Sequence, residues 1–141
     1  MISINSKLMD IINQEAKKAF PNECCGLLAG TGDLITHVNI TQVRASTNIA
    51  IGPTTNRFEV DPKVHFNLIH ELEETKERVV GHYHSHPNHP ARPSEEDIKM
   101  AFDPKMLWVI ISLDEHFIKE VRAHMLNESG AAFQEVPLIV I

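Results

Sequence analysis

The sequence predicts a single mixed α/β domain of the α+β type, with a mostly antiparallel sheet flanked by helices. Three observations support this fold class. Segments whose apolar residues recur at helical spacing are followed by short apolar runs bounded by turn residues. The chain has 141 residues, which suits one compact domain, and it is 43% hydrophobic and 23% charged, as soluble globular proteins are. We therefore expect residues 1–141 to form one domain.

The first predicted element is an amphipathic helix over residues 6–20. Ser6 is its candidate N-cap, and Pro21-Asn22 ends it. Its inward stripe is formed by apolar residues at helical spacing: Leu8, Ile11, Ile12, Ala16 and Phe20. After it, the apolar run 24–29 predicts a buried strand, and the turn residues 30–33 lead into a second strand over 34–40, with a weaker extension over 41–47.

The second helix begins at Asp61-Pro62, where an acidic cap precedes proline at the first helical position. It is expected to reach about Thr75 and to turn these residues inward: Val64, Leu68, Ile69 and Leu72. A third helix is expected from Ser94 to near Asp103. The remaining predictions are a loop over 48–57, strands over 57–60, 79–84, 107–113, 116–125 and 133–141, and a proline-rich loop over 87–93.

Charge and patterning exclude several classes of protein. The net charge is -6 and no basic tract is concentrated in the chain, so we expect no nucleic-acid partner. No apolar run reaches about 18 residues, so we expect no membrane span. The N-terminus lacks a basic segment followed by a long apolar core, which indicates no secretory signal and predicts a cytoplasmic location.

The most informative segment is Gly81-His82-Tyr83-His84-Ser85-His86-Pro87. Residues i and i+2 of a strand share one face and lie roughly 7 Å apart at their bases, so His84 and His86 can converge on one ion. Imidazole is a common zinc ligand. An isolated His-x-His is nevertheless more often a surface strand without a metal.

The segment Ser94-Glu95-Glu96-Asp97 offers a third ligand. An acid at the start of the predicted helix would complete three protein ligands, as in open catalytic zinc sites. On spacing alone Glu95 and Glu96 compete with Asp97 for this role. The same segment also resembles a helix-capping box, in which Ser94 and Asp97 serve only the backbone.

Glu23 and the adjacent cysteines lie at the start of the first buried strand. A carboxylate there can act as a general base with a shifted pKa, although an exposed loop acid is the commoner case. Cys24 and Cys25 are neighbours and cannot staple distant segments. A thiol nucleophile is one interpretation of the pair, and two small buried residues is the favoured one.

Taken together, these segments resemble the JAMM family of metallopeptidases, whose fold is called the MPN domain. The family signature is an upstream glutamate, then His-x-His, seven residues, serine, two residues and aspartate. His84-Ser85-His86, Ser94 and Asp97 match this spacing, and the segment around Glu23 is similar to the upstream glutamate segment. The resemblance covers about residues 6–115 and implies a curved mixed sheet.

The resemblance also implies an activity. Zn²⁺ would be bound by His84, His86 and Asp97, Glu23 would be the general base, and Ser94 would help to stabilise the oxyanion. The small prokaryotic branch of the family, which Phe58-Glu59-Val60-Asp61-Pro62 and Ala91-Arg92-Pro93-Ser94 resemble, releases adducts from the C-terminal Gly-Gly of ubiquitin-like sulfur-carrier proteins.

Two alternatives belong to other classes. One is a metal-binding or scaffold module without turnover, which the complete signature disfavours. The other is a zinc-dependent deaminase, which would need a Pro-Cys-x-x-Cys pair that this sequence lacks. His82 departs from the family pattern, where an apolar residue is expected, and this raises a question about the packing behind His84.

Overall fold

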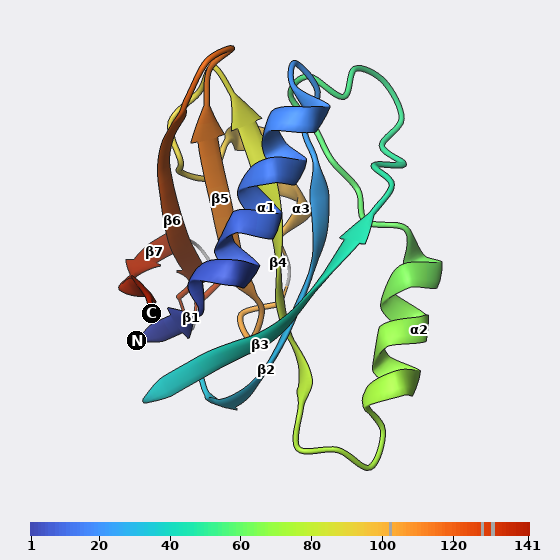
Figure 1. The fold of residues 1–141 in the computed structure, drawn as a ribbon, viewed down its shortest axis with the longest axis vertical. Helices are drawn as coiled ribbons and strands as arrows, with labels where there is room; N and C mark the ends of the chain where they lie inside the picture. The colour runs from blue at the N-terminus through green and yellow to red at the C-terminus, as the bar shows by residue number, and fades with distance from the viewer. Residues whose placement is uncertain (102, 128, 131) are drawn as a thin grey trace.

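The described residues form one eight-stranded sheet with three helices (Figure 1). The structure is a computed structural model that describes residues 1–101, 103–127, 129–130 and 132–141. The strands are β1 (Ile2–Ile4), β2 (Cys25–Asp33), β3 (His37–Ser46), β4 (Arg78–Pro87), β5 (Leu107–Leu113), β6 (Ile118–Leu126), β7 (Phe133–Val136) and β8 (Leu138–Val140). The helices are α1 (Ser6–Ala19), α2 (Pro62–Leu72) and α3 (Glu95–Met100).

The sheet is mixed and mostly antiparallel, as predicted. Its strand order is β7-β6-β5-β4-β2-β3-β1-β8. The pairs β2–β3, β2–β4, β5–β6 and β6–β7 are antiparallel, while β4–β5, β1–β3 and β1–β8 are parallel. β4, the strand with the clustered histidines, therefore lies in the middle of the sheet, between β2 and β5.

The two ends of the sheet are formed by neighbouring residues of the chain. β7 and β8 lie at opposite ends of the strand order, yet only Pro137 separates them. One residue spans only about 3.5 Å, so the sheet has to curl until its two edges approach each other. Proline cannot donate to a ladder, which explains why the predicted strand 133–141 is divided at this residue.

An N-terminal strand, which the sequence patterns did not indicate, completes this edge. β1 pairs in parallel with β3 and β8, and both Ile2 and Ile4 are almost fully buried. The two chain ends consequently lie close together in Figure 1. Three residues are too few to show a strand period, so this element depends on its distant partners.

Helix α1 confirms the first predicted helix with two corrections. Its N-cap is Asn5 and not Ser6, because the Asn5 side chain accepts a hydrogen bond of 2.9 Å from the Leu8 backbone N–H. Ile11 is 47% exposed and does not belong to the inward stripe, which consists of Met9, Ile12 and Ala16. Those three recur at spacings of three and four, which place Ile11 outside their face.

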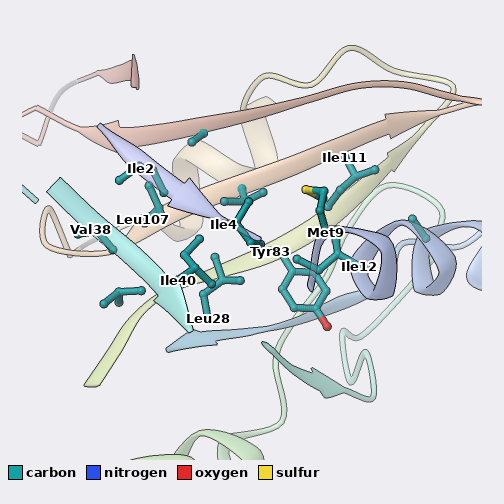
Figure 2. Packing of buried hydrophobic residues seen from close by; sticks show 14 of the residues in the cluster. Ile2, Ile4, Met9, Ile12, Leu28, Val38, Ile40, Tyr83, Leu107 and Ile111 are labelled. Carbon is teal, nitrogen blue, oxygen red and sulfur yellow. The ribbon is translucent and has the colours of Figure 1, made fainter. Parts of the chain in front are cut away.

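The main hydrophobic core lies between α1 and one face of the sheet (Figure 2). Met9 and Ile12 of the helix pack against strand residues from across the chain, among them Leu28, Ile40, Tyr83 and Ile111. Figure 1 shows α1 in front of the sheet and α3 behind it. The face that carries His84 is therefore the face that α1 leaves uncovered.

Helix α2 packs with a second, smaller core on that other face. Asp61 caps it and Pro62 is its first residue, as predicted. Leu68 and Leu72 pack with Leu27, whereas Ile69 is 48% exposed and does not point inward as expected.

Other boundaries differ by several residues. Residues 30–33 continue β2 instead of turning, so the turn falls at 34–36. The expected strand 57–60 is reduced to one bridge between Asn48 and Val60. The third helix ends at Met100, and residue 102 of its predicted range lies outside the described residues. Among the described helices none has the length and apolar character needed to cross a bilayer.

Candidate active site

β4 brings the two histidines of the His-x-His segment together. His84 and His86 alternate with Tyr83 and Ser85, so both imidazoles lie on the face opposite α1. Their Nε2 atoms are 3.0 Å apart, and both side chains are buried. Pairing with β2 on one side and β5 on the other makes this strand a rigid mount for two side chains.

The start of α3 brings a carboxylate to the same point. Oδ2 of Asp97 lies 3.2 Å from Nε2 of His84 and 3.0 Å from Nε2 of His86. Ser94 and Asp97 also form the predicted capping box: Ser94 Oγ accepts from the Asp97 N–H at 3.1 Å, and Asp97 Oδ2 accepts from the Ser94 N–H at 2.9 Å. The carboxylate of Asp97 therefore caps α3 and also lies next to both histidines.

The structure separates Asp97 from its two rivals. Asp97 is 2% exposed, whereas Glu95 is exposed and Glu96 is partly exposed and pairs with Lys99 at 3.8 Å. Successive residues of a helix point about 100° apart, so only one of three consecutive acids can face β4.

The three donor atoms suit a zinc ion. Two imidazole nitrogens and one carboxylate oxygen are zinc ligands, and tetrahedral coordination places such atoms about 3.3 Å from one another. The observed separations of 3.0, 3.2 and 3.0 Å are close to this value. Nδ1 of His86 lies 2.8 Å from the Pro90 carbonyl, and this contact orients Nε2 toward His84 and Asp97. These three side chains are called the centre below.

His84 is oriented by packing instead. Its ring stacks on Phe58 with centroids 4.0 Å apart and an interplanar angle of 15°. Its buried Nδ1 has no hydrogen-bond partner among the described residues. The two histidines thus differ in what holds them, a carbonyl for His86 and an aromatic face for His84.

Glu23 lies beside this group although it is far from it in sequence. One carboxylate oxygen of Glu23 and one ring nitrogen from each of His84 and His86 all lie within 4.8 Å of one another. The side chain is 5% exposed, and its Oε1 has no hydrogen-bond partner in the described chain. Burial raises the pKa of Glu23 to about 8; His86 opposes this shift and Asp97 adds to it.

Burial and hydrogen bonding shift the pKa values of the other three groups in different directions. Burial raises the pKa of Asp97, but His84, His86 and the Ser94 N–H outweigh it, and the pKa is lowered overall. Burial lowers the pKa of His84 despite Asp97. Burial also acts to lower the pKa of His86, but the hydrogen bonds with Asp97 and Pro90 raise it overall. An anionic Asp97 is therefore present at neutral pH.

Sequence reasoning missed Asn48, which connects Glu23 to the segment after β3. Its Nδ2 donates to the carbonyls of Glu23 at 3.1 Å and Arg57 at 3.0 Å. Its Oδ1 accepts from the N–H groups of Ala50 at 3.1 Å and Glu59 at 3.0 Å. Nothing in a single sequence marks this asparagine, because its partners are up to 25 residues away.

The cysteines and the extra histidines lie outside the converging group. Cys24 and Cys25 are buried free thiols, and burial raises their pKa to about 11 and about 12. His82 packs edge-on against Trp108 with centroids 4.3 Å apart, so it occupies the expected apolar position without displacing His84. His89 is exposed, as predicted.

A cavity of about 380 Å³ opens beside the converging side chains. Its lining includes Glu23, His86 and Ser94, together with the exposed loop residues Asn56, His89 and Arg92. Glu23, His86 and Ser94 therefore line one cavity although they come from three separate parts of the chain.

Known proteins are similar to this chain in sequence or in fold. The chain is 34% identical over 120 residues to the desampylase of Haloferax volcanii, which is 85% of this chain and 79% of the relative. It is 27% identical over 142 residues to the CysO-cysteine peptidase of Mycobacterium tuberculosis, covering 99% and 92% of the two chains.

Two solved structures are also similar to this chain. A protein of Desulfitobacterium hafniense has a TM-score of 0.84 and 31% identity, covering 100% of this chain and 93% of that one. A JAB1/MPN domain protein of Archaeoglobus fulgidus has a TM-score of 0.58 at 24% identity, covering 99% and 98%, and shows the fold alone. The family model described as prokaryotic homologs of the JAB domain matches residues 5–126. The chain therefore belongs to the prokaryotic JAB-domain family, as its resemblance to JAMM/MPN proteins predicted.

Proposed function

We propose that the chain is a zinc-dependent peptidase that hydrolyses the peptide or isopeptide bond after the Gly-Gly tail of a ubiquitin-like sulfur-carrier protein. The observation that carries the proposal is the convergence of His84, His86 and Asp97 beside the buried carboxylate of Glu23. Relatives named desampylase and CysO-cysteine peptidase support the reaction class and the kind of partner.

Each side chain has a role that its surroundings support. His84, His86 and Asp97 would bind zinc, which supplies Lewis-acid activation of water and of the scissile carbonyl. Glu23 accepts the proton of the attacking water and passes it to the leaving amine. Burial raises its pKa in the metal-free protein, and a zinc ion beside it would favour the charged form that accepts the proton. No acyl-enzyme is needed, and the raised pKa values of both cysteines argue against a thiolate nucleophile.

Ser94 can cap its helix and also contribute to the reaction. In the capping box its Oγ acts only as an acceptor, from the Asp97 N–H. The hydroxyl hydrogen therefore remains to be donated to the oxyanion that forms in the cavity.

The sheet offers a place for the tail. β1 pairs with β3 only as far as Ile40, and within the described chain no strand pairs with the outer side of β3 beyond that residue. An extended Gly-Gly tail can add there as a further strand, since strand addition uses free backbone groups of a sheet edge. β3 leads directly into the segment that carries Asn48 and, in the lining of the cavity, Asn56.

The scaffold alternative is disfavoured by Glu23. A buried carboxylate whose Oε1 has no partner among the described residues weakens a fold, and such groups concentrate at functional sites. The deaminase alternative is disfavoured because Cys24 and Cys25 do not join the candidate ligand atoms of the described chain.

The test is incubation of zinc-loaded protein with candidate carrier conjugates from the same genome, followed by intact-mass analysis. We expect release of the carrier with a free Gly-Gly terminus, and loss of activity on chelation. Glu23→Gln should keep zinc and lower turnover by about 10²–10⁴-fold, because the amide cannot accept the proton. Zinc loss in Glu23→Gln would make this residue a ligand, and near-normal turnover would refute its role as the base.

A further inference from the structure

The position of the Glu23 carboxylate depends on the backbone around it. Its Oε1 has no hydrogen-bond partner among the described residues, so no polar contact orients that oxygen. The backbone, in contrast, is held on both sides. The Glu23 N–H donates to the Thr54 carbonyl at 2.7 Å, and the Glu23 carbonyl accepts from Asn48 Nδ2 at 3.1 Å. Both partners belong to the segment that follows β3.

Asn48 is the centre of this attachment. Its amide uses two donors and two acceptor sites, which is the full hydrogen-bonding capacity of an asparagine side chain. Its contacts with Arg57 and Glu59 lie on either side of Phe58. Phe58 is the residue that stacks on His84 at 4.0 Å. A single side chain thus joins the backbone of Glu23 to the support of a histidine in the centre.

We propose that Asn48 is a positioning residue that sets the placement of Glu23 relative to His84. This inference rests on the proposed function, in which Glu23 transfers a proton beside the histidines. Proton transfer requires heavy atoms within hydrogen-bond reach, and a displacement of about 1 Å costs about 100-fold in rate. Removing the Asn48 amide frees the Glu23 carbonyl and both neighbours of Phe58 together.

The experiment compares Asn48→Ala and Asn48→Asp with the parent chain and with Asn39→Ala, all loaded with zinc. Asn48→Asp keeps the acceptor for Ala50 and Glu59 but loses both donors, and its shape is unchanged. Asn39 is a matched control, because its amide oxygen accepts from Ser3 Oγ at 3.0 Å near the N-terminal strand. We expect kcat on a carrier conjugate to fall about 10- to 100-fold in both Asn48 variants, with KM nearly unchanged.

A double-mutant comparison separates positioning from general damage. In a Glu23→Gln background, Asn48→Ala should lower the residual kcat less than twofold, because no base remains to be placed. Hydrogen exchange of the Glu23 amide gives a readout without turnover: exchange should accelerate in the Asn48 variants and not in Asn39→Ala. The aspartate variant serves if the alanine variant does not fold.

The outcomes distinguish this inference from the proposed function. If the parent does not cleave any conjugate, the proposed function fails, while the exchange measurement still tests the attachment of Glu23. If the parent cleaves and both Asn48 variants keep its kcat, the inference is overturned and the function stands. An equal fall of kcat with and without Glu23 would make Asn48 a structural residue only and would also overturn the inference.

Discussion

Replacing Glu23 with glutamine should stabilise the metal-free protein, and the gain should depend on pH. In the unfolded chain this carboxyl ionises near 4.5, whereas burial raises its pKa in the folded protein to about 8. Between these values the unfolded state binds fewer protons than the folded state, so the free energy of unfolding falls as pH rises. Each pH unit above 4.5 removes about 1.4 kcal/mol, which amounts to about 3 kcal/mol at pH 7.

The measurement is urea unfolding of chelated parent and Glu23→Gln protein at intervals from pH 4 to pH 9. We expect the two free energies of unfolding to be similar near pH 4, to diverge by about 3 kcal/mol at pH 7 and to run parallel above pH 8. Glu95→Gln is the matched control, because it makes the same substitution at an exposed carboxylate that lines the same cavity. A difference between parent and Glu23→Gln that is constant with pH would refute the reasoning.

The same comparison of unfolding free energies with zinc present tests whether Glu23 lies close to the metal. A cation beside the carboxylate favours its charged form, so saturating zinc should reduce the advantage of Glu23→Gln. If the advantage at pH 7 were equal with and without zinc, Glu23 would not lie close enough to the metal to act with it.

Three further predictions concern the same centre. Asp97→Ala should lose most zinc affinity relative to about one zinc per parent chain, measured by metal analysis after dialysis, and parent affinity should fall as pH drops through about 6 because protons compete for the imidazoles. A Cys24→Ala/Cys25→Ala double variant should retain substantial activity in the conjugate assay; inactivation by a thiol alkylator with zinc and fold intact would contradict this. Ser94→Ala should lower the free energy of unfolding by about 1 kcal/mol through loss of the cap, and should lower kcat by about 10²–10³-fold if the hydroxyl stabilises the oxyanion.

Much of the centre could be predicted from short-range patterns. The alternation of a strand places His84 and His86 on one face, and both are found there with Nε2 atoms 3.0 Å apart. Ser94 and Asp97 lie three residues apart, which is the spacing of a capping box, and the box is present. The apolar run 107–113 became β5 with the same limits. These features depend only on the repeat of a helix or a strand.

Other features of the site and the fold depend on contacts between residues that are far apart in the sequence. The choice of Asp97 over Glu95 depends on which side of α3 faces β4, and the patterns alone left both open. β1 was missed because three residues show no strand period, and it is held by its pairing with β3 and β8. β8 falls within the predicted strand 133–141, but its separation from β7 at Pro137 was not predicted.

By itself, the sequence determined which side chains could meet a metal and which elements carry them, since local periodicity encodes both. Only the tertiary structure decided that Glu23 lies buried beside the histidines, with a pKa raised to about 8, and that Asn48 holds its backbone. Proximity between residues 25 to 61 positions apart arises from strand pairing and desolvation, which no spacing within a short segment records.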